Sequence, residues 1–331
     1  MTSDSPLVSI CLPVYNGENY VSQAINSILD QTFENFELII SDNASTDGTS
    51  DICRDAAARD GRVRYYRADT NRGLSWNHNR AFELARGRYL THLGHDDVMG
   101  KEYVSQCIAA LQADSRAVLS FTTPTHIDET GKVIERFPNH NPGASESPSK
   151  RFYDILGDDW CHAIYGVMKT AILRKTSLHG GFADADRVLL AEIGLRGRFA
   201  LVQGHLFSRR VHAGASTQKY RNVTERTTVI FDPMKAGKVT FPRLLQASRL
   251  FSAIRRSTLP LDECLSCYCA LLRWLWSEHR RHLLDELCHK GLAALRTTPK
   301  TRPAGRCAAD LVCEPAGFAR EGLLSPALKT Y

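Results

Sequence analysis

Short apolar runs alternate with stretches of helical spacing along the first third of the chain. Runs of strand length stand at residues 7–14, 36–41, 63–66 and 89–93. The first is apolar at nearly every position, which is typical of a strand buried on both faces of a parallel sheet. Helical spacing of apolar side chains follows at residues 20–29, in a stretch that ends at Ala58, and at residues 74–85. Strands that alternate with helices of this length predict right-handed crossovers and a mostly parallel, doubly wound α/β sheet.

The middle of the chain continues this pattern less regularly. Residues 101–113 predict a helix, residues 117–125 predict a strand, and residues 128–132 predict a hairpin turn. The alternation of strand and helix therefore extends beyond the first third. It weakens over the following hundred residues.

The last hundred residues predict a helical extension of the sheet domain. Residues 244–254 and 261–295 have the spacing of amphipathic helices, with Arg and His on the polar side. Such helices pack on a neighbouring domain or, as the alternative, lie on an anionic membrane surface. Residues 297–331 contain Pro and Gly and are expected to form a loose tail.

The composition adds limits on partners and location. A length of 331 residues, 43% of them hydrophobic and 24% charged, indicates a soluble globular chain that can form two domains. The net charge of +6 fits an anionic substrate, but it is too small to indicate a nucleic-acid partner. Residues 1–6 are polar and carry no export signal, and no apolar run approaches the length of a membrane span. We therefore expect a cytoplasmic protein, with peripheral contact at the membrane through the C-terminal helices as the alternative.

The ten cysteines do not predict a disulfide framework. They are scattered along the chain, so we expect reduced thiols. Cys264, Cys267 and Cys269 approach a metal-ligand spacing. They lie in an apolar, helix-like run without a second pair of cysteines, which disfavours a zinc site there.

The loops after three predicted strands carry the candidate chemistry. They contribute Tyr15 and Asn16, then Asp42, then Asp96 and Asp97. In an open α/β sheet these loops meet at one edge, where ligands bind in the crevice beyond the strand ends. Adjacent carboxylates cannot both sit inside a sheet, but at its edge they suit a hard divalent cation that also touches a phosphate. A solvated Asp-Asp turn is the alternative.

The loop after the first strand excludes two common nucleotide-binding classes. It has no Gly-x-Gly-x-x-Gly sequence, and no Walker sequence occurs in the chain. Dinucleotide dehydrogenases and P-loop enzymes are therefore poor fits. Carboxylates repel phosphate unless a cation lies between them, so the pattern indicates a nucleotide bound through a metal.

Five segments in order resemble the nucleotide-binding half of family 2 glycosyltransferases with the GT-A fold. They lie at residues 8–16, 27–32, 36–49, 71–79 and 85–90. The resemblance is dense over the first third and thinner to about Ser216. It implies a GT-A type, Rossmann-like, doubly wound and mostly parallel sheet. It also implies an inverting enzyme that uses a nucleotide-sugar donor.

The resemblance assigns the donor side of the site to the first loops. Pro13 and Tyr15 would line the pocket for the nucleoside base, and Asp42 would accept a hydrogen bond from a uracil-like ring N–H. A cap of a turn or helix is the alternative role for Asp42. The other matched positions on the nucleotide side are Asn16, Asn71, Gly73 and Asn79.

The resemblance also implies Mn or Mg as the cofactor. Asp96 and Asp97 fall on the Asp-x-Asp region of the family, so Asp96 would contact the ribose or the metal and Asp97 the metal. The family often reads Leu-Asp-Ser-Asp-Asp, whereas this chain has Gly94 in place of the first carboxylate, followed by His95. A zinc site that combines His92 with His95 and Asp96 is disfavoured, because alternation along a strand separates those side chains.

The remaining candidate residues lie on the acceptor side. In the family an acidic pair opens a helix, and the Asp of this pair is the catalytic base. The matching position in this chain is Asp186. Asp184 is the fallback, because Ala185 stands where the family usually has Glu. Asp186 could instead only complement the helix dipole. His212 would be a third metal ligand or a diphosphate contact, and Arg209 or Arg210 would neutralise the leaving group, unless both arginines belong to a solvated turn.

These features together predict one function and two rivals. The chain is expected to move one sugar from a nucleotide-diphosphate donor, preferably UDP-linked, to a hydroxyl of a glycan, lipid-linked or small-molecule acceptor. Its catalytic domain would span residues 1–227, with a nucleotide-binding half at about 1–125 and an acceptor half at about 126–227, followed by a helical region at 228–296. The rivals are a non-catalytic nucleotide-sugar sensor of the same fold and a nucleotidyltransferase.

Overall fold

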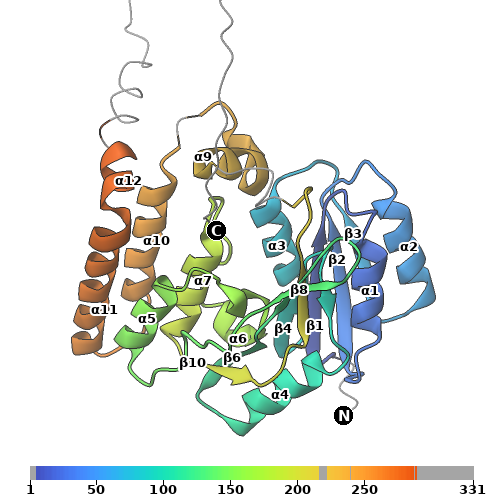
Figure 1. Cartoon of the computed structure of the whole chain (residues 1–331), viewed down its shortest axis with the longest axis horizontal. Coiled ribbons are helices and arrows are strands. Elements are labelled where there is room, and N and C mark those ends of the chain that lie inside the picture. Colours follow the sequence, from blue (N-terminus) through green and yellow to red (C-terminus); the bar gives the residue numbers. More distant parts are fainter. Residues whose placement is uncertain (1–4, 216–221, 239, 287, 289–331) are drawn as a thin grey trace, which may run out of the picture.

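The computed structural model describes residues 5–215, 222–238, 240–286 and 288 (Figure 1). Its strands are β1 Val8–Val14, β2 Phe36–Asp42, β3 Val63–Arg67, β4 Tyr89–His92, β5 Val98–Met99, β6 Ala117–Thr122, β7 Thr125–Ile127, β8 Val133–Arg136, β9 Val167–Lys169, β10 Arg198–Val202 and β11 Phe207–Arg210. The helices of the sheet domain are α1 Val21–Leu29, α2 Thr49–Arg59, α3 Leu74–Glu83, α4 Tyr103–Ala113, α5 Pro148–Leu156, α6 Thr170–Leu173 and α7 Ala185–Gly194, with a short 3-10 helix, η1, at His162–Tyr165.

A seven-stranded sheet forms the centre of the molecule. Its strand order is β10-β6-β9-β4-β1-β2-β3, and only β9 runs antiparallel to its neighbours. Alternate side chains of β1 enter two different cores: Ile10 and Leu12 pack with α1, α2 and α4, whereas Cys11 packs with α3 and α7. Helices therefore cover both faces, and the prediction of a mostly parallel, doubly wound α/β sheet is confirmed.

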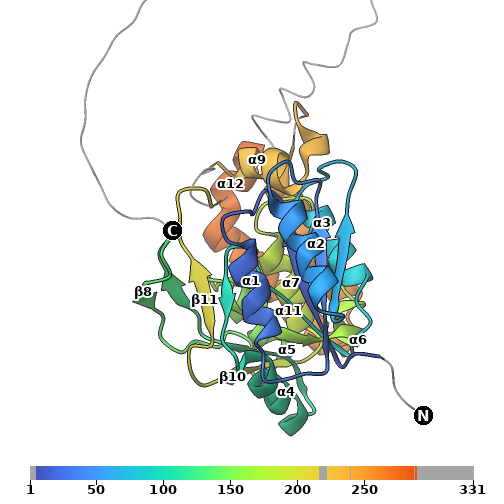
Figure 2. The ribbon, with the colours of Figure 1, turned by 90° about the vertical axis from the view of Figure 1, so that its right-hand side faces the viewer.

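A second sheet has the order β5-β11-β7-β8 and was not predicted (Figure 2). The expected strand at residues 117–125 is in fact two strands, β6 in the central sheet and β7 in the second sheet. The break falls at Thr123 and Pro124, and proline cannot donate a ladder hydrogen bond. The predicted hairpin turn is confirmed, because β7 and β8 pair antiparallel around it. This sheet places β11 against β5, immediately after the Asp96–Asp97 turn.

The C-terminal helices pack on the sheet domain. This region contains α9 Val223–Arg226, the π-helix η2 Thr227–Phe231, the 3-10 helix η3 Pro233–Lys235, α10 Pro242–Arg255, α11 Leu261–Trp274, the π-helix η4 Leu275–His279 and α12 Arg280–Asp285. Leu250 and Ile254 of α10 and Leu271 and Trp274 of α11 are buried in the core that also contains α5 and α7. Figure 1 shows α10, α11 and α12 together on the side of the molecule opposite α1 and α2. The expected tail at residues 297–331 lies outside the described residues.

Two further expectations concern this region. No helix among the described residues has both the length and the apolar character needed to cross a membrane. The eight cysteines that the structure describes, which include Cys264, Cys267 and Cys269, are free thiols. No described group of three or more His, Cys, Asp or Glu side chains is arranged to hold a metal ion.

One buried carboxylate connects neighbouring strands at the end of the sheet opposite the candidate site. Glu37 of β2 accepts hydrogen bonds from the Ser9 hydroxyl of β1 at 2.7 Å and from the backbone N–H of Arg86 at 2.9 Å. The Arg64 guanidinium of β3 donates to its other oxygen at 2.6 Å. Burial opposes ionisation, but these hydrogen bonds hold the pKa of Glu37 below its ordinary value.

We expect Glu37→Gln to lower the free energy of unfolding by about 2 kcal/mol, because the new amide N–H₂ would face the Arg64 guanidinium. Urea denaturation at pH 7 measures this change. Since the pKa of Glu37 is depressed in the folded state, the difference should shrink as the pH falls through that pKa. The exposed Glu34→Gln, which removes the same charge, should change stability by less than about 0.5 kcal/mol. Equal effects of the two substitutions would contradict this role of Glu37.

Candidate active site

Two carboxylates converge where β4 ends. A Cβ atom placed on Gly94 would lie 2.8 Å from Oδ2 of Asp97 and 2.9 Å from Oδ1 of Asp96. Both oxygens therefore crowd the same point, and a side chain at position 94 would displace one of them. The chain thus has Gly94 where the family often has its first carboxylate, and the two carboxylates that follow occupy the space nearest to it.

The electrostatics of this pair are unfavourable without a positive charge. Burial, followed by the nearby charge of Asp96, raises the pKa of Asp97 to about 8. Burial also opposes ionisation of Asp96, but a hydrogen bond from His212 keeps the pKa of Asp96 below its ordinary value. The facing oxygens, Asp96 Oδ1 and Asp97 Oδ2, receive no hydrogen bond from another described residue. Converging, unpaired carboxylate oxygens fit a hard divalent cation such as Mg²⁺ or Mn²⁺.

His212 lies beside this pair, as the sequence predicted. Its Nε2 is 3.0 Å from Oδ2 of Asp96, and this hydrogen bond raises the pKa of His212. No set of three or more candidate ligands in the described part of the chain has the arrangement of a metal site. A cation here would thus be held by the two carboxylates and by oxygens of its substrate, and the assignment of His212 as a third ligand remains a prediction.

Arg210 holds the turn in place from β11. Its backbone N–H donates to Asp97 Oδ1 at 2.9 Å, and its Nε donates to the backbone carbonyl of Asp96 at 2.8 Å. The rest of the guanidinium is bonded to Gln23 and to the carbonyls of Asp128 and Glu129. Arg210 is buried and its guanidinium already donates to these protein groups, so it is not available to bind a leaving group.

Arg209 has the opposite environment. Strand alternation turns its side chain away from that of Arg210, and it has no hydrogen bond or ion pair with any other described residue. Tyr165, Asp97, Asp96 and Asp186 all raise the pKa of Arg209. The guanidinium therefore lies within electrostatic reach of the carboxylate pair and of the predicted base. Of the two candidate arginines, Arg209 is the one that is free to bind an anion.

The acidic residues that open α7 have separate environments. Asp184, the fallback base, forms ion pairs with Arg243 at 2.7 Å and Arg226 at 3.5 Å. Asp186 receives no hydrogen bond from any described residue, and the titratable group beside it is His179, 3.3 Å away. Removal of water by the surrounding protein raises the pKa of Asp186, although part of its side chain remains exposed. The structure therefore favours Asp186 over Asp184 as an available base.

Asp42 is fully buried and already has hydrogen-bond partners. Its oxygens accept from the backbone N–H of Ser45 at 2.8 Å and from the hydroxyls of Ser50 and Tyr65, each at 2.7 Å. Although burial opposes it, these bonds lower the pKa of Asp42. This is the turn-capping role that the sequence left as the alternative. Because the side chain is fully buried, a direct bond to a nucleobase would require the surrounding residues to move.

The loop residues on the nucleotide side support one another. Asn16 accepts from the backbone N–H of Thr46 at 2.8 Å, so it connects the loops after β1 and β2. Asn71 accepts from the Asn43 amide at 2.8 Å and from the Gly73 backbone N–H at 2.9 Å. Gly73 has a φ of 88°, and a Cβ there would lie 2.6 Å from the carbonyl oxygen of Phe231. These contacts shape the rim of the sheet.

Three other predicted nucleotide contacts have different surroundings. Both polar atoms of the Asn79 side chain bind the backbone of His179, at 2.9 Å and 3.0 Å. Asn79 therefore fixes the segment before the predicted base, and its assignment to the nucleotide stays a prediction. Pro13 and Tyr15 lie at the end of β1, and the Tyr15 side chain is exposed, as a base-stacking residue must be.

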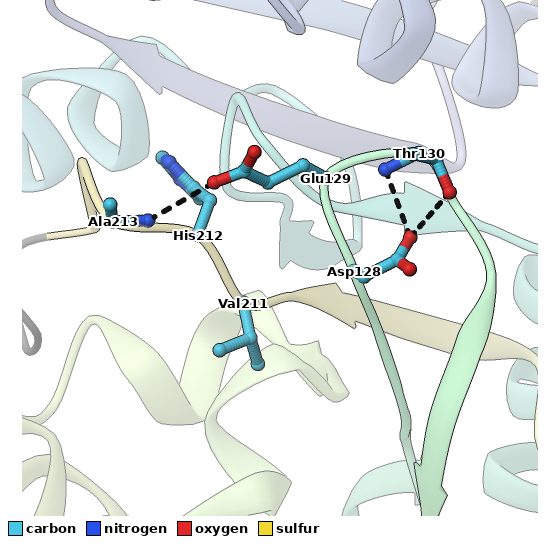
Figure 3. Close-up of a pocket in the computed structure, with 6 residues that line it drawn as sticks. All are labelled: Asp128, Glu129, Thr130, Val211, His212 and Ala213. Carbon is cyan, nitrogen blue, oxygen red and sulfur yellow. Dashed lines mark hydrogen bonds between the residues drawn. The ribbon is translucent and has the colours of Figure 1, made fainter.

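A pocket of about 520 Å³ adjoins the carboxylate pair (Figure 3). The β7–β8 hairpin contributes Asp128, Glu129 and Thr130, and the chain after β11 contributes the facing wall, with His212 at its centre. Glu129 reaches across to this wall, where its carboxylate accepts from the backbone N–H of Ala213 at 3.4 Å. The sequence had predicted only the turn of this hairpin. The hairpin lies close to His212 because β7 pairs with β11.

Comparison with known proteins gives relatives that act on sugars. The putative teichuronic acid biosynthesis glycosyltransferase TuaG of Bacillus subtilis (strain 168) is 34% identical over 137 residues, which cover 41% of this chain and 54% of that protein. The chain thus spans about half the length of this relative. The mannosyltransferase PcManGT from Pyrobaculum calidifontis, solved with GDP-Man and Mn²⁺, aligns with a TM-score of 0.50 at 15% identity over 90% of this chain and 77% of that chain.

TarS 1–349 from S. aureus aligns with a TM-score of 0.59 at 17% identity, covering 87% of this chain and 78% of that chain. A structure of TarS 1–349 in complex with UDP-GlcNAc aligns with a TM-score of 0.52 at 17% identity, covering 86% of this chain and 87% of that chain. At such low identity these likenesses establish the fold alone, and it is the GT-A fold that the sequence resemblance implied.

The family itself is established by a match over more than half of the 331 residues. The model described as Glycosyl transferase family 2 covers residues 9–178, from β1 to the segment that precedes α7. This range contains the converging carboxylates of Asp96 and Asp97. The chain therefore belongs to glycosyl transferase family 2.

Proposed function

We propose that this chain transfers one sugar from a nucleotide-diphosphate donor, preferably a UDP-sugar, to an acceptor hydroxyl, with inversion at the anomeric carbon. One observation carries the proposal: oxygens of Asp96 and Asp97 converge on the point above Gly94, and the charges of this pair and of Asp186 also raise the pKa of Arg209. A pair of carboxylates for a cation, a guanidinium that no described residue occupies and an available base are the three features that a diphosphate leaving group and an attacking hydroxyl need.

Support for the donor comes from the loops and from the structural neighbours. TarS has been solved with UDP-GlcNAc and PcManGT with GDP-Man, so this fold accepts nucleotide-sugar donors. Tyr15 is the exposed ring at the predicted base pocket. Because Asp42 is buried and braces the loop at Ser45, it contributes to uracil preference through the shape of that loop.

The cofactor is a divalent cation, Mn²⁺ or Mg²⁺, held by Asp96 and Asp97. When bound, it would offset the charge that develops on the departing diphosphate. PcManGT, which shares this fold, was solved in complex with Mn²⁺. The fit of the present residues rests on the two carboxylate oxygens that crowd the point above Gly94.

The proposed reaction gives each of the other charged groups a role. The acceptor oxygen attacks the anomeric carbon while its proton passes to Asp186, and the bond from that carbon to the diphosphate oxygen breaks. Arg209 would bind the diphosphate as its negative charge grows. A single displacement of this kind inverts the anomeric configuration.

The acceptor and the location belong to the same proposal. A glycan, a lipid-linked sugar or a small-molecule hydroxyl would serve as acceptor, and the name of TuaG associates one relative with teichuronic acid biosynthesis. We place the protein in the cytoplasm. The exposed Leu265, Leu272 and Trp276 on the C-terminal helices would favour peripheral contact with a membrane.

The direct test is incubation of the full chain with a set of UDP-sugars and Mn²⁺, with and without candidate acceptors. Release of UDP with transfer of the sugar supports the proposal. Donor binding without UDP release would indicate the non-catalytic sensor, and release of pyrophosphate would indicate the nucleotidyltransferase. Either result would overturn the proposed reaction.

We expect Asp97→Asn to lower transfer by about a thousandfold, because the site loses one of two charges that hold the cation. The same substitution should raise the free energy of unfolding at pH 8, measured without divalent cations, by about 1–3 kcal/mol, because it removes a buried carboxylate beside Asp96. The control Asp30→Asn, at the far end of α1, should leave both quantities unchanged. A fully active Asp97→Asn protein would remove the cation assignment.

We expect Asp186→Asn to retain UDP binding and lose at least about a hundredfold in kcat, because the amide cannot accept the acceptor proton. Asp184→Asn is the matched control, since Asp184 is paired with Arg243 and should affect kcat by less than about tenfold. Transfer assays under saturating donor measure both values. A reversed order would make Asp184 the base.

We expect the affinity for Mn²⁺ with UDP to rise with pH and to level off above about pH 8. Below that pH Asp97 holds a proton that must leave before a cation can bind, so the affinity should change by up to about tenfold per pH unit. Calorimetric titrations at pH 6, 7 and 8 measure the slope. Asp97→Asn should bind more weakly and show a much flatter profile; an equally steep profile would assign the proton to another group.

A further inference from the structure

His179 is a buried histidine that the proposed reaction does not yet use. It precedes α7, and its Nδ1 lies 3.3 Å from Oδ1 of Asp186. Neither ring nitrogen has a hydrogen-bond partner among the described residues. An unsatisfied buried imidazole beside an available carboxylate is unusual, because buried polar groups are nearly always paired.

The backbone of His179 is held unusually firmly for a loop residue. The Asn79 side chain accepts from its N–H at 2.9 Å and donates to its carbonyl at 3.0 Å. The Ser75 hydroxyl donates to the next carbonyl, that of Gly180, at 2.6 Å. Helix α3 therefore fixes the position of the His179 ring relative to α7, and the ring has little freedom to leave Asp186.

The surroundings determine the protonation of the ring. The rings of His78, Phe82 and His92 surround it, at centroid distances of 4.9 Å, 5.8 Å and 6.2 Å. Burial lowers the pKa of His179 to about 4, so the imidazole is neutral at physiological pH and carries a single N–H. The tautomer with the proton on Nδ1 faces Asp186 with a donor, whereas the other tautomer faces the carboxylate with a lone pair.

Resting on the proposed role of Asp186, we propose that His179 is a positioning residue that donates its Nδ1–H to Oδ1 of Asp186. This bond fixes the carboxylate and leaves its second oxygen to take the proton of the acceptor hydroxyl. The proton then resides on Asp186, and His179 keeps its own. Hydrogen bonds in such pairs are often loosely aligned until the substrate binds.

The test compares four proteins in the full chain, the unsubstituted protein and three variants. His179→Asn places an amide near the position of Nδ1, whereas His179→Gln places it near Nε2, away from Asp186. His179→Leu removes the donor and keeps an apolar side chain. We expect His179→Leu and His179→Gln to lose about 10- to 100-fold in kcat with little change in donor KM, and His179→Asn to recover most of that loss.

The pH profile separates positioning from packing. Loss of a donor to an ionised carboxylate raises its pKa, so the acidic limb of the kcat profile should move up by roughly one pH unit in His179→Leu and stay in place in His179→Asn. The other charged or titratable groups that face the pair are the same in all four proteins: His78 of α3, His92 of β4, Cys161 and Tyr165 at the ends of η1, Asp184, Arg209 of β11 and Arg226 of α9.

Unfolding curves and UDP binding establish that each variant is folded. If His179→Leu does not fold, the comparison of the two amide variants decides. Equal losses in His179→Asn and His179→Gln, or an unchanged kcat and acidic limb in all variants, would overturn the role of His179. The same data would leave the proposed function intact provided that Asp186→Asn is inactive; an active Asp186→Asn would instead overturn the base assignment itself.

Discussion

The site depends on two like charges brought together where little water can reach them. Asp96 and Asp97 crowd the same point above Gly94, and burial together with the charge of Asp96 favours a proton on Asp97. The fold holds them there through Arg210, which donates to the Asp97 carboxylate and to the backbone of Asp96. The interaction energy of such a pair becomes favourable only when a cation adds positive charge. The site is thus arranged for binding at the expense of local stability.

The second sheet brings two arginines, Arg209 and Arg210 of β11, close to the Asp96–Asp97 pair. β11 pairs with β5 directly after the carboxylates, and alternation along β11 turns Arg209 and Arg210 in opposite directions. Arg210 enters the protein and becomes structural, whereas Arg209 has no ion-pair partner among the described residues. Asp184 and Asp186 differ in a similar way at the start of α7, since arginines neutralise the first and a neutral histidine faces the second.

The sequence predicted the central sheet because local pattern defines each long strand, so Asp42, Asp96 and Asp97 could be placed at one edge without a structure. β5, β7 and β9 are two or three residues long and depend on distant partners, so no periodicity could reveal them. Side-chain contacts were the least predictable part of the site. Nothing in the spacing of Asn79 and His179 indicates that they bind each other across 100 positions. Residue type gives the chemistry that a side chain can perform, but tertiary contacts decide whether it is free to perform it.

The C-terminal helices pack against the helix that carries the proposed base. Arg243 of α10 neutralises Asp184, and α10 and α11 share a core with α5 and α7, so the proposed base stands on a helix that the last part of the chain stabilises. The family match ends at residue 178, before Asp186, Arg209 and α10. In the proposed reaction the acceptor hydroxyl meets Asp186 on α7, so the residues that would select the acceptor are to be sought around α7, in a part of the chain that the match does not reach.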